Sequence, residues 1–85
     1  MSERVCIFRR IRVNHGTTRR PSFQYFQRWE DDGGEWAWWT RDAGEAFAFP
    51  DQGEARASLR RIRQHDRSGP LANMAARIVR VMGSR

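Results

Sequence analysis

The chain has 85 residues and a formal net charge of +6, and all 16 of its basic residues are arginine. A chain this short forms one small domain with a marginal core, because it buries only about 60–65% of the surface that its unfolded form exposes. Cys6 is the one cysteine, which excludes an intrachain disulfide and a Cys-rich zinc site. No apolar run approaches the roughly 20 residues of a membrane span, and no signal-peptide pattern opens the chain. We therefore expect a cytoplasmic protein that does not enter membranes.

The charges are sorted into three blocks along the chain. Residues 1–28 hold seven Arg and one acid, residues 29–55 hold eight acids and one Arg, and residues 56–85 hold eight Arg and one acid. Segregated charge gives a surface field with distinct poles, which orients polyanionic or acidic partners. The absence of Lys is also what a GC-rich genome produces, but codon usage does not explain the clustering of the Arg residues.

The first predicted strand covers residues 4–13. Its apolar phase holds Val5, Ile7, Ile11 and Val13. Arg9 interrupts this phase, which a bulge or an edge position would accommodate. Residues 14–21 have the composition of a loop.

Residues 23–30 and 35–41 predict a β-hairpin around the turn sequence Asp31-Asp32-Gly33-Gly34. An even-length turn gives one apolar face, which we assign to the core: Phe23, Tyr25, Trp29, Trp36 and Trp38. The other face then holds Phe26, Arg28, Ala37, Trp39 and Arg41. On this second face, Phe26 and Trp39 are the candidates for exposed aromatic contacts with a partner. A register slip of one residue would exchange the two faces.

The clearest local signal is a capping box, with Asp51 at the N-cap and Glu54 three residues later. We expect a helix from about Gln52 to His65, with a buried stripe of Ala55, Leu59 and Ile62. Residues 46–50 form an apolar connector, with a brief edge strand as one option. In the tail, residues 71–76 suit a short helix and residues 77–81 suit a strand.

For the tail we favour a last strand beside the first, and a second helix is the alternative. The expected architecture is a single α+β domain over residues 1–85, in β-β-β-α-β order. It has an antiparallel sheet of three to four strands with one helix packed on one face.

The candidate binding surface is made of arginines from the two basic blocks. They are Arg9, Arg10, Arg12, Arg19 and Arg20 from the first block, and Arg56, Arg60, Arg61, Arg63 and Arg67 from the predicted helix. An ordinary solvated helix face interleaves acids at i±4, whereas this helix offers only Asp66, so the stripe favours binding of phosphates or carboxylates. The aromatic hairpin is alternatively a stacking platform for unpaired bases.

The pattern gives little support for catalysis. His15 and His65 have no Cys, Asp or His at metal-ligand spacing, and no phosphate loop or nucleophile elbow occurs. We expect no metal, no cofactor and no enzymatic activity. A small basic ribonuclease toxin using His15 or His65 is the third-ranked function.

The stretch from Trp39-Thr40 through Ala46, Phe49 and Glu54-Ala55 resembles a layout found in small phage and prophage proteins. In that layout a hairpin leads into A-x-x-F and then into a capped helix that opens with E-A. The resemblance covers about half of the chain, and the size and charge polarity are similar to those of anti-CRISPR proteins. It implies a phage-encoded inhibitor that acts in the host cytoplasm.

The expected function is therefore non-catalytic binding. The arginine surface would engage nucleic acid, or the acidic surface of a nucleic-acid-handling complex such as a CRISPR effector. A direct DNA- or RNA-binding regulator is the alternative, and a homodimer is compatible with either function.

Overall fold

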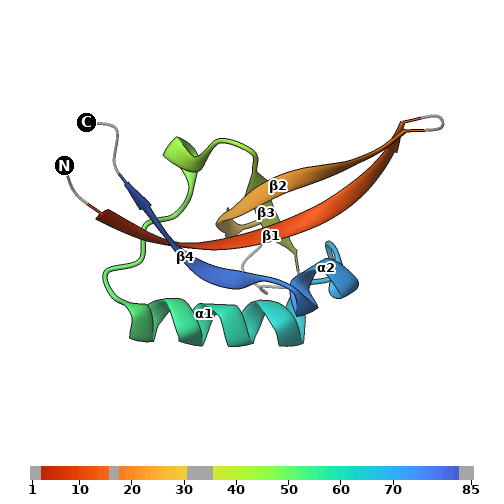
Figure 1. The fold of residues 1–85 in the computed structure, drawn as a ribbon. Helices are drawn as coiled ribbons and strands as arrows, with labels where there is room; N and C mark the ends of the chain where they lie inside the picture. The colour runs from red at the N-terminus through yellow and green to blue at the C-terminus, as the bar shows by residue number, and fades with distance from the viewer. Residues whose placement is uncertain (1–2, 16–17, 31–35, 83–85) are drawn as a thin grey trace.

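The computed structural model describes residues 3–15, 18–30 and 36–82, and for residues 12–15 and 18–21 it describes the backbone alone. The elements in chain order are β1 (Glu3–His15), β2 (Thr18–Trp29), β3 (Ala37–Thr40), the 3-10 turn η1 (Ala43–Glu45), α1 (Gln52–His65), α2 (Pro70–Met74) and β4 (Arg77–Met82). The four strands form one antiparallel sheet in the order β3-β2-β1-β4, and α1 lies across one face of it (Figure 1). The α+β prediction is confirmed, and the tail contains both the favoured last strand and a short helix.

β1 is a central strand, with Phe8 opposite Tyr25 on β2 and opposite Arg77 on β4. Past this point β1 and β2 continue as a two-stranded ribbon that projects from the rest of the molecule (Figure 1). The pairing extends to His15 and Thr18. The prediction of a loop over residues 14–21 is therefore wrong for every residue of it that the structure describes, since strong hydrogen-bonded pairing overrides the turn composition.

Toward the other end of the sheet β1 and β2 separate, and residues 47–49 lie between them, bonded to both. The Phe47 N–H donates to the carbonyl of Phe26 at 2.9 Å, and the Phe49 N–H donates to the carbonyl of Val5 at 2.9 Å. The apolar connector is thus bonded to both strands instead of forming an edge strand. Phe49 is brought to the core in this way, and its ring stacks on that of Phe26 with a centroid distance of 6.2 Å.

The helix α1 begins and ends where the sequence predicts. The Asp51 carboxylate accepts the Glu54 N–H at 2.8 Å, which satisfies one of the amide groups left free at a helix start. The predicted stripe of Ala55, Leu59 and Ile62 is buried and packs against the sheet. The buried core consists of Ile7, Phe26, Ala37, Phe49, Ala55, Leu59, Ile62 and Ala76.

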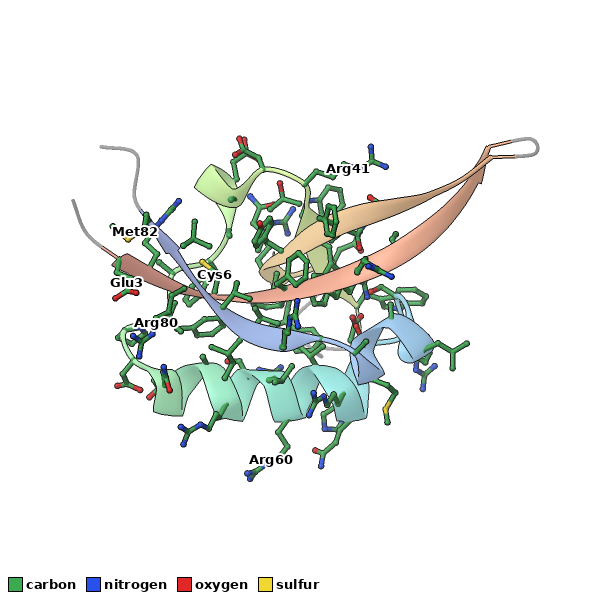
Figure 2. The ribbon with its side chains drawn as sticks, in the orientation of Figure 1. Glu3, Cys6, Arg41, Arg60, Arg80 and Met82 are labelled. Carbon is green, nitrogen blue, oxygen red and sulfur yellow. The ribbon has the colours of Figure 1, made fainter. Side chains whose placement is uncertain are left out.

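The opposite face of the sheet is covered at one end only, by η1. Arg4 on β1 donates to the carbonyl of Ala43 at 3.0 Å and to that of Gly44 at 3.2 Å. Cys6, two residues along the same strand, is fully buried (Figure 2). Burial raises the pKa of the Cys6 thiol, although the charge of Arg4 opposes the rise. The rest of this face is left without a covering layer in the part of the chain that the structure describes.

Candidate functional site

The uncovered face of the sheet carries aromatic side chains from three strands. Strand alternation places Phe8 of β1, Phe23 and Tyr25 of β2 and Trp38 of β3 on the face opposite α1. Phe23 is 49% exposed and Trp38 is 45% exposed, whereas Phe8 and Tyr25 are half-buried. Large aromatic groups this exposed are not needed by the core and are available to a partner.

Contacts between the rings fix their positions. Phe8 stacks on Phe23 with centroids 5.6 Å apart and planes 20° apart. Phe8 also meets Tyr25 at 5.5 Å in a tilted arrangement. Ring pairs at these separations attract one another beyond the area that they bury. The three rings therefore present a preformed aromatic surface.

Three exposed arginines lie among these rings. The Arg28 guanidinium is 5.2 Å from the centre of the Trp38 ring, and that of Arg77 is 5.6 Å from the centre of the Phe8 ring. Arg10 pairs with Phe23 across β1 and β2, so the two residues share this face. We call the seven residues together the open face: Phe8, Arg10, Phe23, Tyr25, Arg28, Trp38 and Arg77.

The predicted hairpin faces are wrong mainly because α1 covers the face of Phe26 and Trp39 instead of the face of Phe23 and Trp38. A bulge in β2 adds a second difference. Phe26 lies opposite Trp39 and Arg28 lies opposite Trp38, which leaves Gln27 without a partner on β3. The extra residue breaks the i, i+2 alternation, so Tyr25 and Trp29 fall on different faces. Of the set that we assigned to the core, Phe23, Trp36 and Trp38 are exposed by 49%, 44% and 45%.

The two candidate exposed aromatics have structural roles instead. Phe26 is only 4% exposed and belongs to the core. Trp39 is half-buried, and its indole N–H donates to the Asp66 carboxylate at 3.1 Å. The prediction that they are exposed is wrong for Phe26, and a contact between Trp39 and a partner stays a prediction.

Arg9 is also removed from the predicted binding surface, because it is 4% exposed. Its Nε donates to Gln24 at 2.8 Å and its Nη1 donates to Asn73 at 2.8 Å. Nη1 also lies 3.8 Å from an Asp66 oxygen, and the guanidinium lies 4.0 Å from the centre of the Trp39 ring. The interruption in the apolar phase of β1 is therefore neither a bulge nor an edge position, but a buried charge held by Gln24, Asn73 and Asp66.

Asp66, the partner of Arg9, follows α1 as its C-cap and is 5% exposed. Burial alone would raise the pKa of Asp66, but hydrogen bonds outweigh it and hold the pKa below its ordinary value. The donors are the backbone N–H groups of Ala37 and Ser68 and the side chains of Ser68 and Asn73. Burial lowers the pKa of Arg9, while the charge of Asp66 opposes that change. An arginine nevertheless stays protonated, so the pair is ionic.

The arginines of α1 do not act as one stripe. The Arg63 guanidinium donates to the carbonyl of Ala76 at 2.7 Å and ties α1 to the start of β4. Arg61 lies 4.6 Å from the centre of the Trp29 ring. Arg56 contacts Gln52 at 3.4 Å, and Arg60 extends from the outer side of α1 away from the sheet (Figure 2). Among the described residues, Arg56 and Arg60 are thus exposed cations of α1 with no structural bond to another element, and Arg67 is exposed just beyond the end of the helix.

Arg12, Arg19 and Arg20 belong to the β1–β2 ribbon, where Arg12 pairs with Pro21 and Arg19 pairs with Asn14 in the backbone register. Their side chains lie outside the described part of the structure, as does the predicted turn at Asp31–Gly34. The alternation of residues in β1 already indicates part of the open face, because Phe8 and Arg10 lie on the strand face opposite to Ile7 and Arg9.

Within the described residues, no group of His, Cys, Asp and Glu side chains is arranged to hold a metal ion. Neither helix there has the length and apolar character needed to cross a membrane. Comparison with protein-family models, curated protein sequences and solved structures gave no match. The open face and the α1 surface are therefore the two candidate binding sites.

Proposed function

We propose that the protein is a non-catalytic module that binds single-stranded nucleic acid on its open face. The observation that carries the proposal is the combination of four solvent-accessible aromatic rings and three arginines on an uncovered antiparallel sheet. Aromatic side chains interleaved with basic ones are the recurring arrangement by which proteins hold unpaired bases.

The chemistry of the open face suits unpaired bases better than a duplex. Stacking of a base on an aromatic ring contributes about 1–3 kcal/mol, and it requires a base face that is not already covered by neighbouring base pairs. Phe23 and Trp38 supply the most accessible rings. The guanidinium groups of Arg10, Arg28 and Arg77 supply charge for the phosphates that connect the bases.

Acidic residues set a boundary to the binding surface. Asp42 and Glu45 flank the η1 end of the sheet, where they disfavour phosphate. The β1–β2 ribbon on the opposite side carries Arg10 at its base. The phosphates of a bound strand would therefore lie over Arg10, Arg28 and Arg77 and avoid η1.

The proposal is tested by fluorescence anisotropy with a labelled single-stranded oligonucleotide and with a duplex of the same sequence. We expect Phe23→Ala and Trp38→Ala each to weaken single-strand binding about tenfold, since each removes one stacking surface. Met74→Ala is the matched control, because Met74 is 69% exposed but lies on α2. Equal binding by all three variants and the parent, or preference for the duplex, would refute the proposal.

A second candidate function uses the other side of the molecule. A groove of about 470 Å³ lies on α1 beside α2, lined by Arg56, Arg60, Arg63 and Met74 among others. Leu71 on α2 is 89% exposed. Apolar groups rimmed by arginine fit an acidic protein surface, which favours docking on a nucleic-acid-handling complex in the manner of a phage-encoded CRISPR inhibitor.

This candidate is tested by Arg56→Glu with Arg60→Glu in a cleavage assay with purified CRISPR effector complexes. Arg63 is not used, because its bonds to the backbone make a loss of folding indistinguishable from a loss of binding. Inhibition by the parent that the double variant loses would support docking through α1. Absence of inhibition by the parent would contradict the candidate.

A further inference from the structure

A pocket of about 360 Å³ opens at the end of the sheet where β1 and β2 separate. Its floor is apolar, since the rings of Phe26 and Phe49 are buried by packing against each other. Its walls are the bulged end of β2, the connector around Phe47 and the first turns of α1. Its volume lies within the range of small-ligand sites, which is about 300–1,000 Å³.

Two aromatic walls give the pocket a preference for a flat ligand. Phe47 is 46% exposed although Phe49 packs against it at 4.7 Å, so part of its ring is accessible to a ligand. Trp29 is half-buried and is covered on one side by the Arg61 guanidinium. The exposed parts of Phe47 and Trp29 are not needed for the core, because Phe26 and Phe49 already fill the core at this end of the sheet.

The polar groups of the pocket have the capacity to recognise a base and its phosphate. Gln27, the unpaired residue of the bulge, lines the pocket, and its amide group can both donate to and accept from a base edge. Ser58 of α1 adds a hydroxyl group. Arg28 and Arg61 at the rim outnumber the single carboxylate of Glu54, so the rim favours an anion.

Arg28 connects this pocket to the open face, because it lines the pocket and also lies over the Trp38 ring. We propose that the pocket takes one unstacked base of the strand bound on the open face, with the adjoining phosphate held by Arg28 and Arg61. This inference rests on the proposed function, and it adds a defined position where the strand leaves the sheet and one base is enclosed.

The test compares two exposed arginines, one at the pocket and one away from it. Arg61→Ala is expected to weaken binding of a single-stranded oligonucleotide about three- to tenfold and to reduce the slope of log affinity against log salt by about 0.7. Arg80→Ala is the control, since Arg80 is exposed on β4 but lines neither this pocket nor the open face. Equal affinities and slopes for the two variants would overturn the inference.

A second experiment replaces single nucleotides of the oligonucleotide by abasic sites. An abasic site at one position of the oligonucleotide should weaken binding to the parent protein. The same abasic site should have no further effect on binding to Phe47→Ala, because that variant has already lost the ring against which the base packs. Thermal melting establishes that Phe47→Ala is folded, and Phe47→Leu serves if it is not. Oligonucleotide binding in which no position couples to Phe47 would overturn the pocket inference while leaving the open face intact. Absence of oligonucleotide binding altogether would overturn both.

Discussion

At the scale of single residues, the least expected feature is an ion pair buried in the interior of a small domain. Removing two charges from water is costly, and the attraction between them offsets the cost only when the remaining hydrogen bonds are satisfied. Here Arg9 and Asp66 meet that condition through Gln24, Asn73 and Ser68. Asp66 also accepts hydrogen bonds from Ala37 of β3 and Asn73 of α2. The pair therefore connects the end of α1 and the helix α2 to the sheet.

Arg9→Ala should be strongly destabilising, because it leaves the Asp66 carboxylate buried without its counter-charge. We expect a loss of about 3–5 kcal/mol in the free energy of unfolding, measured by urea denaturation. Arg80→Ala is the control: its pair with Glu3 is exposed, and surface pairs contribute about 0–1 kcal/mol. Similar denaturation midpoints for Arg9→Ala and Arg80→Ala would contradict the structural role assigned to Arg9.

The lowered pKa of Asp66 also predicts how the stability of the protein depends on pH. Its pKa in the folded protein is lowered, so its stabilising contribution is present above the ordinary pKa of about 3.9 and is lost as the pH falls through the folded value. The difference in unfolding free energy between the parent and Asp66→Asn should therefore shrink below about pH 4. Urea denaturation of both proteins from neutral to acidic pH measures it, and a difference that stays constant would show that the hydrogen bonds to Asp66 do not favour its charged form.

At the scale of elements, α1 illustrates local signals that determine local structure. Its N-cap, its buried stripe and its end before the Ser68-Gly69-Pro70 sequence all follow from short-range patterns, and the structure confirms each. The helix also has a tertiary function, because it covers the face of the sheet that carries Ile7 and leaves the other face open.

Two substitutions in α1 separate the cap from the core. Asp51→Ala should cost about 0.5–2 kcal/mol of stability, because it removes the acceptor for the Glu54 N–H. Leu59→Ala should cost about 2–5 kcal/mol, because it leaves a cavity against the sheet. Gln64→Ala, exposed on the same helix, is the control for changes in helix propensity. Thermal or urea unfolding measures the stabilities of the three variants. A Leu59→Ala variant as stable as Gln64→Ala would exclude the packing of α1 on the sheet.

The hairpin of β2 and β3 shows where sequence reasoning fails at this scale. Strand identity and pairing were predictable from turn residues and aromatic content. The faces were not, because they depend on which side of the sheet α1 covers and on a bulge at Gln27, and neither follows from the hairpin sequence. Arg9 was likewise unpredictable as a core residue, since its partner Asp66 is far away in the sequence.

At the scale of the whole molecule, the charge blocks do not produce a single basic surface. The fold places Arg10, Arg28 and Arg77 on the open face and Arg56 and Arg60 on the outer side of α1, with the sheet between the two groups. The structure confirms that basic groups are exposed, and the kind of partner stays a prediction. Which of them share a face follows from the topology β3-β2-β1-β4.

This arrangement predicts the oligomeric state. Two copies that stack their open faces would bring the arginines of both copies together, and like charges at an interface cost several kcal/mol. We therefore expect a monomer at physiological salt by sedimentation velocity. A dimer that Trp38→Ala converts to monomer would contradict this, and it would identify the open face as a homodimer interface.

The central claim, that the open face binds unpaired bases, is tested most directly by nuclear magnetic resonance. In a titration of the labelled protein with a single-stranded oligonucleotide, stacked bases should shift the ring signals of Phe8, Phe23, Tyr25 and Trp38 to higher field. The signals of Leu71 and Met74 beside α1 should stay in place. Shifts confined to α1 and α2, with the four rings unchanged, would contradict the claim and favour docking through the arginines of the helix.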